Sequence, residues 1–180
     1  MSPVKKTSNI ILVGLMGAGK TTVGRSLAKR LEKSFVDTDL EIEERTGVRV
    51  SVIFEIEGEV GFRKRESDAL SRIVASDNMV LATGGGVILD SNNRDLLRLS
   101  GCVVYLHARP GELAKRLGHD KTRPLLQGME PIKRLEELYS VRDPLYREVA
   151  DIVVDTGRQS VSTMLGQLLA RVESECKLIP

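Results

Sequence analysis

The sequence predicts an α/β protein, a three-layer α/β/α fold around a central five-stranded parallel sheet. Two features lead to this prediction: five short apolar runs, and longer stretches between them in which apolar residues recur at helical spacing. The runs show little alternation, as expected for strands buried on both faces. Strands that alternate with helices form right-handed βαβ units, which give a parallel sheet. With 180 residues and no repeat or linker, we expect a single domain, residues 1–180.

The apolar runs are the predicted strands, and the helices lie between them. The strands are Ile10–Val13, Phe35–Val36, Met79–Ala82, Cys102–Leu106 and Ile152–Val154. The helices are predicted over residues 21–33, 40–45, 61–75, 90–99, 110–117, 132–139 and 160–176, and an extension of the sixth towards residue 149 is left open. Residues 118–131 have no clean periodicity. A polar loop of this length in a compact domain is usually functional or disordered.

Charge and composition argue against several classes of partner. The 27 Lys and Arg against 25 Asp and Glu give a net charge of +2, too balanced for a protein that depends on polyanion attraction. Phe and Tyr number three each and Trp is absent, so there are few platforms for stacking bases. No stretch approaches the ~20 apolar residues of a membrane span. We therefore expect no nucleic-acid partner, no membrane association and a cytoplasmic location.

The cysteines and histidines show no pattern of a metal site. Cys102 and Cys176 set no disulfide framework and are predicted to be free thiols in a reducing compartment. His107 and His119 have no ligand-spaced neighbours.

The residues after the first strand fit the phosphate-binding pattern G-x-x-x-x-G-K-[ST], as GLMGAGKT over residues 14–21. A chance Gly-rich turn is the alternative, but the strand before the motif and the amphipathic helix after it match the context of a P-loop. In such a site Lys20 reaches the β- and γ-phosphates and the Thr21 hydroxyl joins a Mg²⁺ shell. The predicted nucleotide-binding residues are Gly17, Ala18, Gly19, Lys20, Thr21 and Thr22.

A pair of carboxylates ends the second predicted strand. Asp37 and Asp39 would share a face if the chain is extended there, at the edge of the sheet where ligands bind. One could hold Mg²⁺ and the other could accept the proton of an alcohol. The alternative is that Asp39 only caps a helix starting at Leu40.

Glycines and arginines complete the candidate site. Gly84, Gly85 and Gly86 follow a buried strand and either admit a ligand or form a flexible turn. Any one arginine is most often a solvated surface residue, but a set of guanidinium forks suits carboxylates and phosphoryl groups. The arginines of this set are Arg63, Arg123 and Arg142.

Taken together, these motifs give the chain a resemblance to bacterial shikimate kinases over nearly its whole length. The matching segments, in family order, are residues 14–21 (GLMGAGKT), 37–39 (DTD), 61–66 (GFRKRE), 81–86 (LATGGG), 123–126 (RPLL) and 142–146 (RDPLY). The resemblance implies a P-loop NTPase fold of the nucleoside monophosphate kinase-like type. It also implies a shikimate-binding helical segment at about 40–75, a mobile lid at about 118–131, and work as a monomer.

The resemblance further implies an activity, the ATP-dependent phosphorylation of the shikimate 3-hydroxyl with Mg²⁺, in the pathway to chorismate and the aromatic amino acids. It gives Asp39, Lys20 and Arg123 catalytic roles, with Asp39 as candidate base and shikimate ligand. The remaining implied roles are Asp37 near Mg²⁺ through water, Arg63 and Arg142 on the shikimate carboxylate, Gly84, Gly85 and Gly86 along the ring, Arg123 on the phosphates, Arg116 and Arg158 near adenine, and Glu66 positioning Arg63.

Two other functions remain open from the residues alone. A P-loop kinase for nucleoside monophosphates or gluconate would share the phosphate loop but need a different acceptor pocket. A regulatory ATP-binding module would bind nucleotide without turnover.

Overall fold

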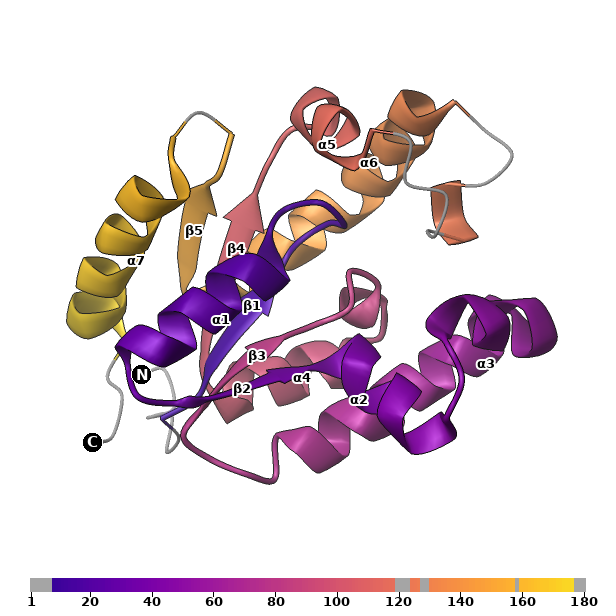
Figure 1. Ribbon diagram of the computed structural model, residues 1–180, viewed down its shortest axis with the longest axis horizontal. Helices are drawn as coiled ribbons and strands as arrows, with labels where there is room; N and C mark the ends of the chain where they lie inside the picture. The colour runs from indigo at the N-terminus through magenta and orange to yellow at the C-terminus, as the bar shows by residue number, and fades with distance from the viewer. Residues whose placement is uncertain (1–7, 119–123, 127–129, 158, 177–180) are drawn as a thin grey trace.

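The computed structural model describes residues 8–118, 124–126, 130–157 and 159–176 (Figure 1). It confirms the predicted five-stranded parallel sheet, with strand order β2-β3-β1-β4-β5. The strands are β1 (Ile10–Val13), β2 (Ser34–Asp37), β3 (Met79–Ala82), β4 (Cys102–His107) and β5 (Ile152–Asp155). The residues of β1 are all 0% exposed, as the unbroken apolar run requires for a central strand.

Helices pack on both faces of this sheet and beyond one of its edges. They are α1 (Lys20–Arg30), α2 (Thr38–Thr46), α3 (Val50–Ile73), α4 (Ser91–Ser100), α5 (Pro110–Leu117), α6 (Pro131–Val149) and α7 (Val161–Glu175), with short 3₁₀ turns η1 (Val87–Leu89) and η2 (Pro124–Leu126). In Figure 1, α1 lies in front of the sheet with α7, and α4 and α6 pass behind it. The helices α2 and α3 pack together beside β2.

The expected start of the third helix is wrong. The sequence predicted residues 61–75, but α3 begins at Val50 and is kinked at Gly58, which has a φ of 68°. The first part of α3 was missed because it shows no apolar stripe. Ile56 and Val60 are 77% and 86% exposed, so apolar residues stand on its solvent side and break the helical periodicity.

The expectation of free thiols is also wrong, because Cys102 and Cys176 form a disulfide. Their Cα atoms lie 5.7 Å apart although 74 residues separate them in the sequence. The helix α7 follows β5 and returns along the sheet, which brings its end to the start of β4. That proximity comes from the chain path and leaves no signal in the spacing of the cysteines.

Among the described residues, none of the helices has both the length and the hydropathy that crossing a membrane requires.

Gly24 lets α1 lie close against the sheet. A Cβ there would come within 2.6 Å of the Phe35 ring and 3.2 Å of the Leu12 side chain. We expect Gly24→Ala to lower the free energy of unfolding by about 1–3 kcal/mol, since overpacking must move one of these elements. Gly166→Ala is the matched control, because its Cβ would meet nothing within 4 Å. The control should raise stability by up to about 1 kcal/mol through helix propensity. Denaturant unfolding measures both, and equal effects of the two substitutions would contradict the packing argument.

Candidate active site

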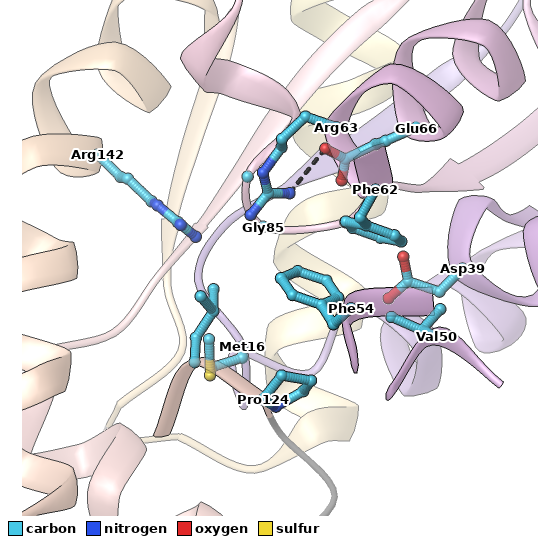
Figure 2. A pocket seen from close by; sticks show the side chains of 13 residues that line it. Met16, Asp39, Val50, Phe54, Phe62, Arg63, Glu66, Gly85, Pro124 and Arg142 are labelled. Carbon is cyan, nitrogen blue, oxygen red and sulfur yellow. Dashed lines mark hydrogen bonds and ion pairs between the residues drawn. The ribbon is translucent and has the colours of Figure 1, made fainter. Parts of the chain in front are cut away.

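A pocket opens where the carboxyl ends of the strands meet α3, α6 and the turn after β3 (Figure 2). Arg142 reaches in from α6, while Arg63 and Glu66 enter from α3, with Asp39 close by. The lining residues are Met16, Asp39, Val50, Phe54, Phe62, Arg63, Glu66, Gly84, Gly85, Gly86, Pro124, Leu125 and Arg142. All six predicted substrate-binding residues line this pocket: Asp39, Arg63, Gly84, Gly85, Gly86 and Arg142.

The phosphate loop lies between β1 and α1, as the motif predicts. Gly19 takes a left-handed conformation, with a φ of 95°, at the N-cap of α1, where a side chain would be strained. The first turn of α1 holds no acidic residue, so its positive end is not neutralised from within the helix. Lys20 Nζ donates to the carbonyl oxygens of Gly14 and Leu15 at 2.7 and 2.9 Å. The ammonium group is therefore held over the loop.

The two carboxylates at the end of β2 serve different places. Asp37 is the N-cap of α2, and its Oδ1 accepts from the amides of Asp39 and Leu40. The interpretation of Asp39 as the helix cap is therefore wrong. So is the expected extended chain, because α2 has already begun at Thr38. The helical turn directs Asp39 into the pocket, whereas Asp37 faces the phosphate loop.

Asp37 and Thr21 bring two oxygens together beside that loop. Thr21 Oγ1 donates to Asp37 Oδ2 at 2.8 Å. A hydroxyl and a carboxylate next to a phosphate site are the donors that a hard divalent cation prefers. Among the residues that the structure describes, no group of three or more His, Cys, Asp or Glu side chains could hold a metal ion.

Arg63 is tied to two carboxylates. Its Nη1 donates to Glu66 Oε2 at 2.8 Å, and its Nη2 donates to Glu59 Oε1 at 3.0 Å. Burial by itself would lower the pKa of Arg63, but the two carboxylates outweigh it and raise the pKa. Glu66 is only 1% exposed, and burial raises the pKa of its carboxyl despite the opposing effect of Arg63.

Arg142 has a different environment. It is 3% exposed, and burial lowers the pKa of its guanidinium. The phenol of Tyr146 on the same helix lies beside it and acts against that lowering of the pKa. Sequence analysis gave no role to Tyr146, although it ends the 142–146 segment; its spacing of four from Arg142 on a helix could have indicated the contact.

The glycines after β3 form a turn that is bonded to α2 and crowded by charged side chains. Gly84 N donates to Thr38 Oγ1 at 2.8 Å. A Cβ on Gly84 would lie 2.2 Å from Glu66 Oε1 and 3.1 Å from an Asp39 carboxylate oxygen. A Cβ on Gly86 would lie 2.1 Å from Arg63 Cζ. Side chains are therefore absent from this turn because charged groups occupy the space.

Of the remaining predicted residues, the structure describes Arg116, which lies beside the phosphate loop. Arg116, at the end of α5, donates to Thr156 Oγ1 at 3.1 Å and to the carbonyl of Gly17 at 3.3 Å, next to the phosphate loop. Arg123 and Arg158 lie outside the described residues. The apolar wall of the pocket was not predicted; in it the rings of Phe54 and Phe62 lie 4.6 Å apart. Phe54 belongs to the part of α3 that has no periodic signal.

A phosphate loop beside a pocket lined by cationic and carboxylate groups defines the class: a P-loop kinase for a small acceptor. A family model described as "Shikimate kinase" matches residues 16–173. A shikimate kinase of Burkholderia lata is 55% identical over 166 residues, covering 92% of this chain and 90% of its relative. One from Ralstonia nicotianae is 53% identical over 173 residues, covering 96% and 91%. The chain belongs to the shikimate kinase family.

Solved structures agree with this assignment. The shikimate kinase from Acinetobacter baumannii in complex with shikimate superposes with a TM-score of 0.90 at 46% identity, covering 94% of this chain and 95% of that one. A gluconokinase from Sinorhizobium meliloti, at 20% identity and a TM-score of 0.64, shares the fold. The chain is thus an ATP-using phosphotransferase that acts on an alcohol group.

The raised pKa of Glu66 predicts the direction of one pH effect on stability. A folded-state pKa above the ordinary 4.5 gives a contribution that is present at low pH and is lost as pH rises through the folded value. We expect wild type to lose more free energy of unfolding than Glu66→Gln as pH rises from about 4.5 to neutrality.

Glu175→Gln is the control, because Arg171 lowers the pKa of the Glu175 carboxyl. Its contribution runs the other way and is lost as pH falls. Denaturant unfolding at a series of pH values gives all three curves. A Glu66→Gln curve parallel to wild type would show that the buried carboxyl does not titrate as described.

Proposed function

We propose that this chain transfers the γ-phosphoryl group of ATP to the 3-hydroxyl of shikimate, giving shikimate 3-phosphate and ADP. The observation that carries the proposal is the pairing of Arg63 and Arg142 with Asp39 around the Gly84–Gly86 turn. Guanidinium groups suit a carboxylate, and a carboxylate suits hydroxyls, so the pocket matches an acid that carries several hydroxyl groups. The shikimate named in the Acinetobacter baumannii structure is such a molecule.

On the acceptor side, Arg63 and Arg142 bind the carboxylate and set the orientation of the ring. Gly84, Gly85 and Gly86 have no side chains, so the shikimate ring can come close to their backbone. Asp39 binds hydroxyl groups and takes the proton of the attacking hydroxyl as its oxygen bonds to the γ-phosphorus, while the bond to the ADP oxygen breaks. Since phosphoryl transfer needs mainly positioning and positive charge, these residues supply most of what the acceptor requires.

On the nucleotide side, the loop amides and Lys20 bind the phosphates. Gly17, Ala18, Gly19, Lys20, Thr21 and Thr22 form this binding set, Arg116 and Arg158 lie by adenine, and Arg123 reaches the phosphates. Thr21 and Asp37 hold Mg²⁺, directly or through water, and the 2.8 Å contact between their oxygens supports this. Bound there, Mg²⁺ neutralises charge on the phosphate oxygens.

The same proposal covers the organisation of the chain. Residues 1–180 act as one kinase domain, with residues 40–75 binding shikimate and residues 118–131 forming the lid. The enzyme works as a cytoplasmic monomer in the supply of aromatic amino acids.

The test is ADP release from MgATP with shikimate, with gluconate, CMP and AMP as parallel acceptors. Of the four acceptors, we expect only shikimate to support turnover, with shikimate 3-phosphate as the product. Turnover with another acceptor would keep the kinase class and overturn the substrate. ATP binding without turnover on any of the four would instead favour the regulatory module.

Asp39→Asn should lower kcat by at least ~10²-fold, because the amide cannot accept the hydroxyl proton. Glu41→Gln is a matched control: Glu41 is another acid in the first turn of α2, but it lines a separate cavity with Arg45 on the outer side. Steady-state kinetics with shikimate measure both variants. A near-normal kcat for Asp39→Asn would limit Asp39 to binding hydroxyls.

A further inference from the structure

Tyr146 is a buried residue behind the acceptor pocket, and it contacts the turn after β3. It lies on α6 and is 0% exposed. Its hydroxyl donates a hydrogen bond to the carbonyl oxygen of Gly85 and lies beside the Arg142 guanidinium, with which it interacts electrostatically. Burial raises the pKa of the phenol, so the group stays neutral. One hydroxyl therefore donates to the turn and lies against the Arg142 guanidinium.

This arrangement sets Arg142 apart from Arg63. The charge of Arg63 is shared with Glu59 and Glu66, at 3.0 and 2.8 Å. Within the part of the chain that the structure describes, no carboxylate makes an ion pair with Arg142, which a neutral phenol holds instead. Because a phenol fixes a guanidinium without neutralising it, Arg142 keeps its charge for a carboxylate ligand.

The position of the turn depends on the same contact. A Cβ placed on Gly85 would lie 3.5 Å from both Arg142 Nη1 and Tyr146 Oη, and 3.4 Å from the carbonyl oxygen of Gly14. Gly14 is the first residue of the phosphate loop, and its oxygen also accepts from Lys20. The phenol, the guanidinium and the loop thus converge on one glycine.

We propose that Tyr146 is a positioning residue for substrate binding, which holds Arg142 and the Gly85 backbone in the arrangement that receives the shikimate carboxylate. This inference rests on the proposed function. The simpler alternative is that Tyr146 only fills space, since its ring packs against Tyr105 with centroids 4.9 Å apart. The two explanations differ in one expectation. Only a positioning role predicts that loss of the hydroxyl weakens the binding of shikimate and leaves the binding of ATP unchanged.

Tyr146→Phe keeps the ring and removes the hydroxyl. We expect the KM for shikimate to rise about tenfold, as for a lost hydrogen bond to a charged group, with kcat and the KM for ATP nearly unchanged. Tyr105→Phe is the matched control: Tyr105 is equally buried, and its hydroxyl bonds Asp143 Oδ1 at 2.8 Å. The control should leave the KM for shikimate unchanged. An unchanged KM in Tyr146→Phe, or an equal rise in both variants, would overturn the proposal.

A double-mutant cycle shows whether Tyr146 acts through Arg142. In an Arg142→Gln background, adding Tyr146→Phe should raise the KM for shikimate by less than about twofold, since the partner has gone. A full additional tenfold rise would overturn the assigned route.

A measurement on wild type keeps the proposal testable if Tyr146→Phe does not fold. The chain has three tyrosines and no tryptophan, so its tyrosine absorption band is unmasked. Saturating shikimate should shift that band, and the shift should persist in Tyr105→Phe and Tyr139→Phe. Absence of the shift, or its loss in either of those variants, would count against Tyr146. Failure of the proposed function would be recognised separately, because wild type itself would then show no turnover with shikimate.

Discussion

Gly84 and Gly86 leave no room for a side chain in the turn after β3, and the rest of the site depends on this constraint. Polar groups from three helices reach this turn: Thr38 from α2, Glu66 and Arg63 from α3, and Tyr146 and Arg142 from α6. The turn is itself anchored to the central strand, because Thr83 donates from its amide and its hydroxyl to the carbonyl of Leu12. A side chain on Gly84 would displace Glu66, and one on Gly86 would displace Arg63.

The two arginines beside the turn differ in how their positive charge is compensated. Because both are largely buried, this difference affects which ligand the pocket can bind. Arg63 is offset by the carboxylates of Glu59 and Glu66, while Arg142 is held by a phenol. Removing charged groups from water is costly, so each charge needs a partner within the protein or a ligand. An acid with hydroxyl groups supplies the missing negative charge and receives the hydrogen bonds that remain.

The start of α2 places two nearby carboxylates on different sides of the site. Asp37 caps the helix and contacts Thr21 by the phosphate loop, whereas Asp39, two residues later on the helical turn, enters the acceptor pocket. If the chain had stayed extended, both carboxylates would share one face. The change from strand to helix at Thr38 thus directs one carboxylate to the phosphate loop and the other to the pocket.

The sequence by itself determined the sheet, the phosphate loop and the residue types of the site, because these depend on local patterns. Five apolar runs define the strands, and GLMGAGKT needs only a strand before it and a helix after it. Tertiary structure decided how the distant parts meet: the Tyr146 hydroxyl at Gly85, the disulfide between Cys102 and Cys176, and the aromatic wall from the kinked α3. These contacts join residues that are far apart in the chain or that show no periodicity, so only the folded path brings them together.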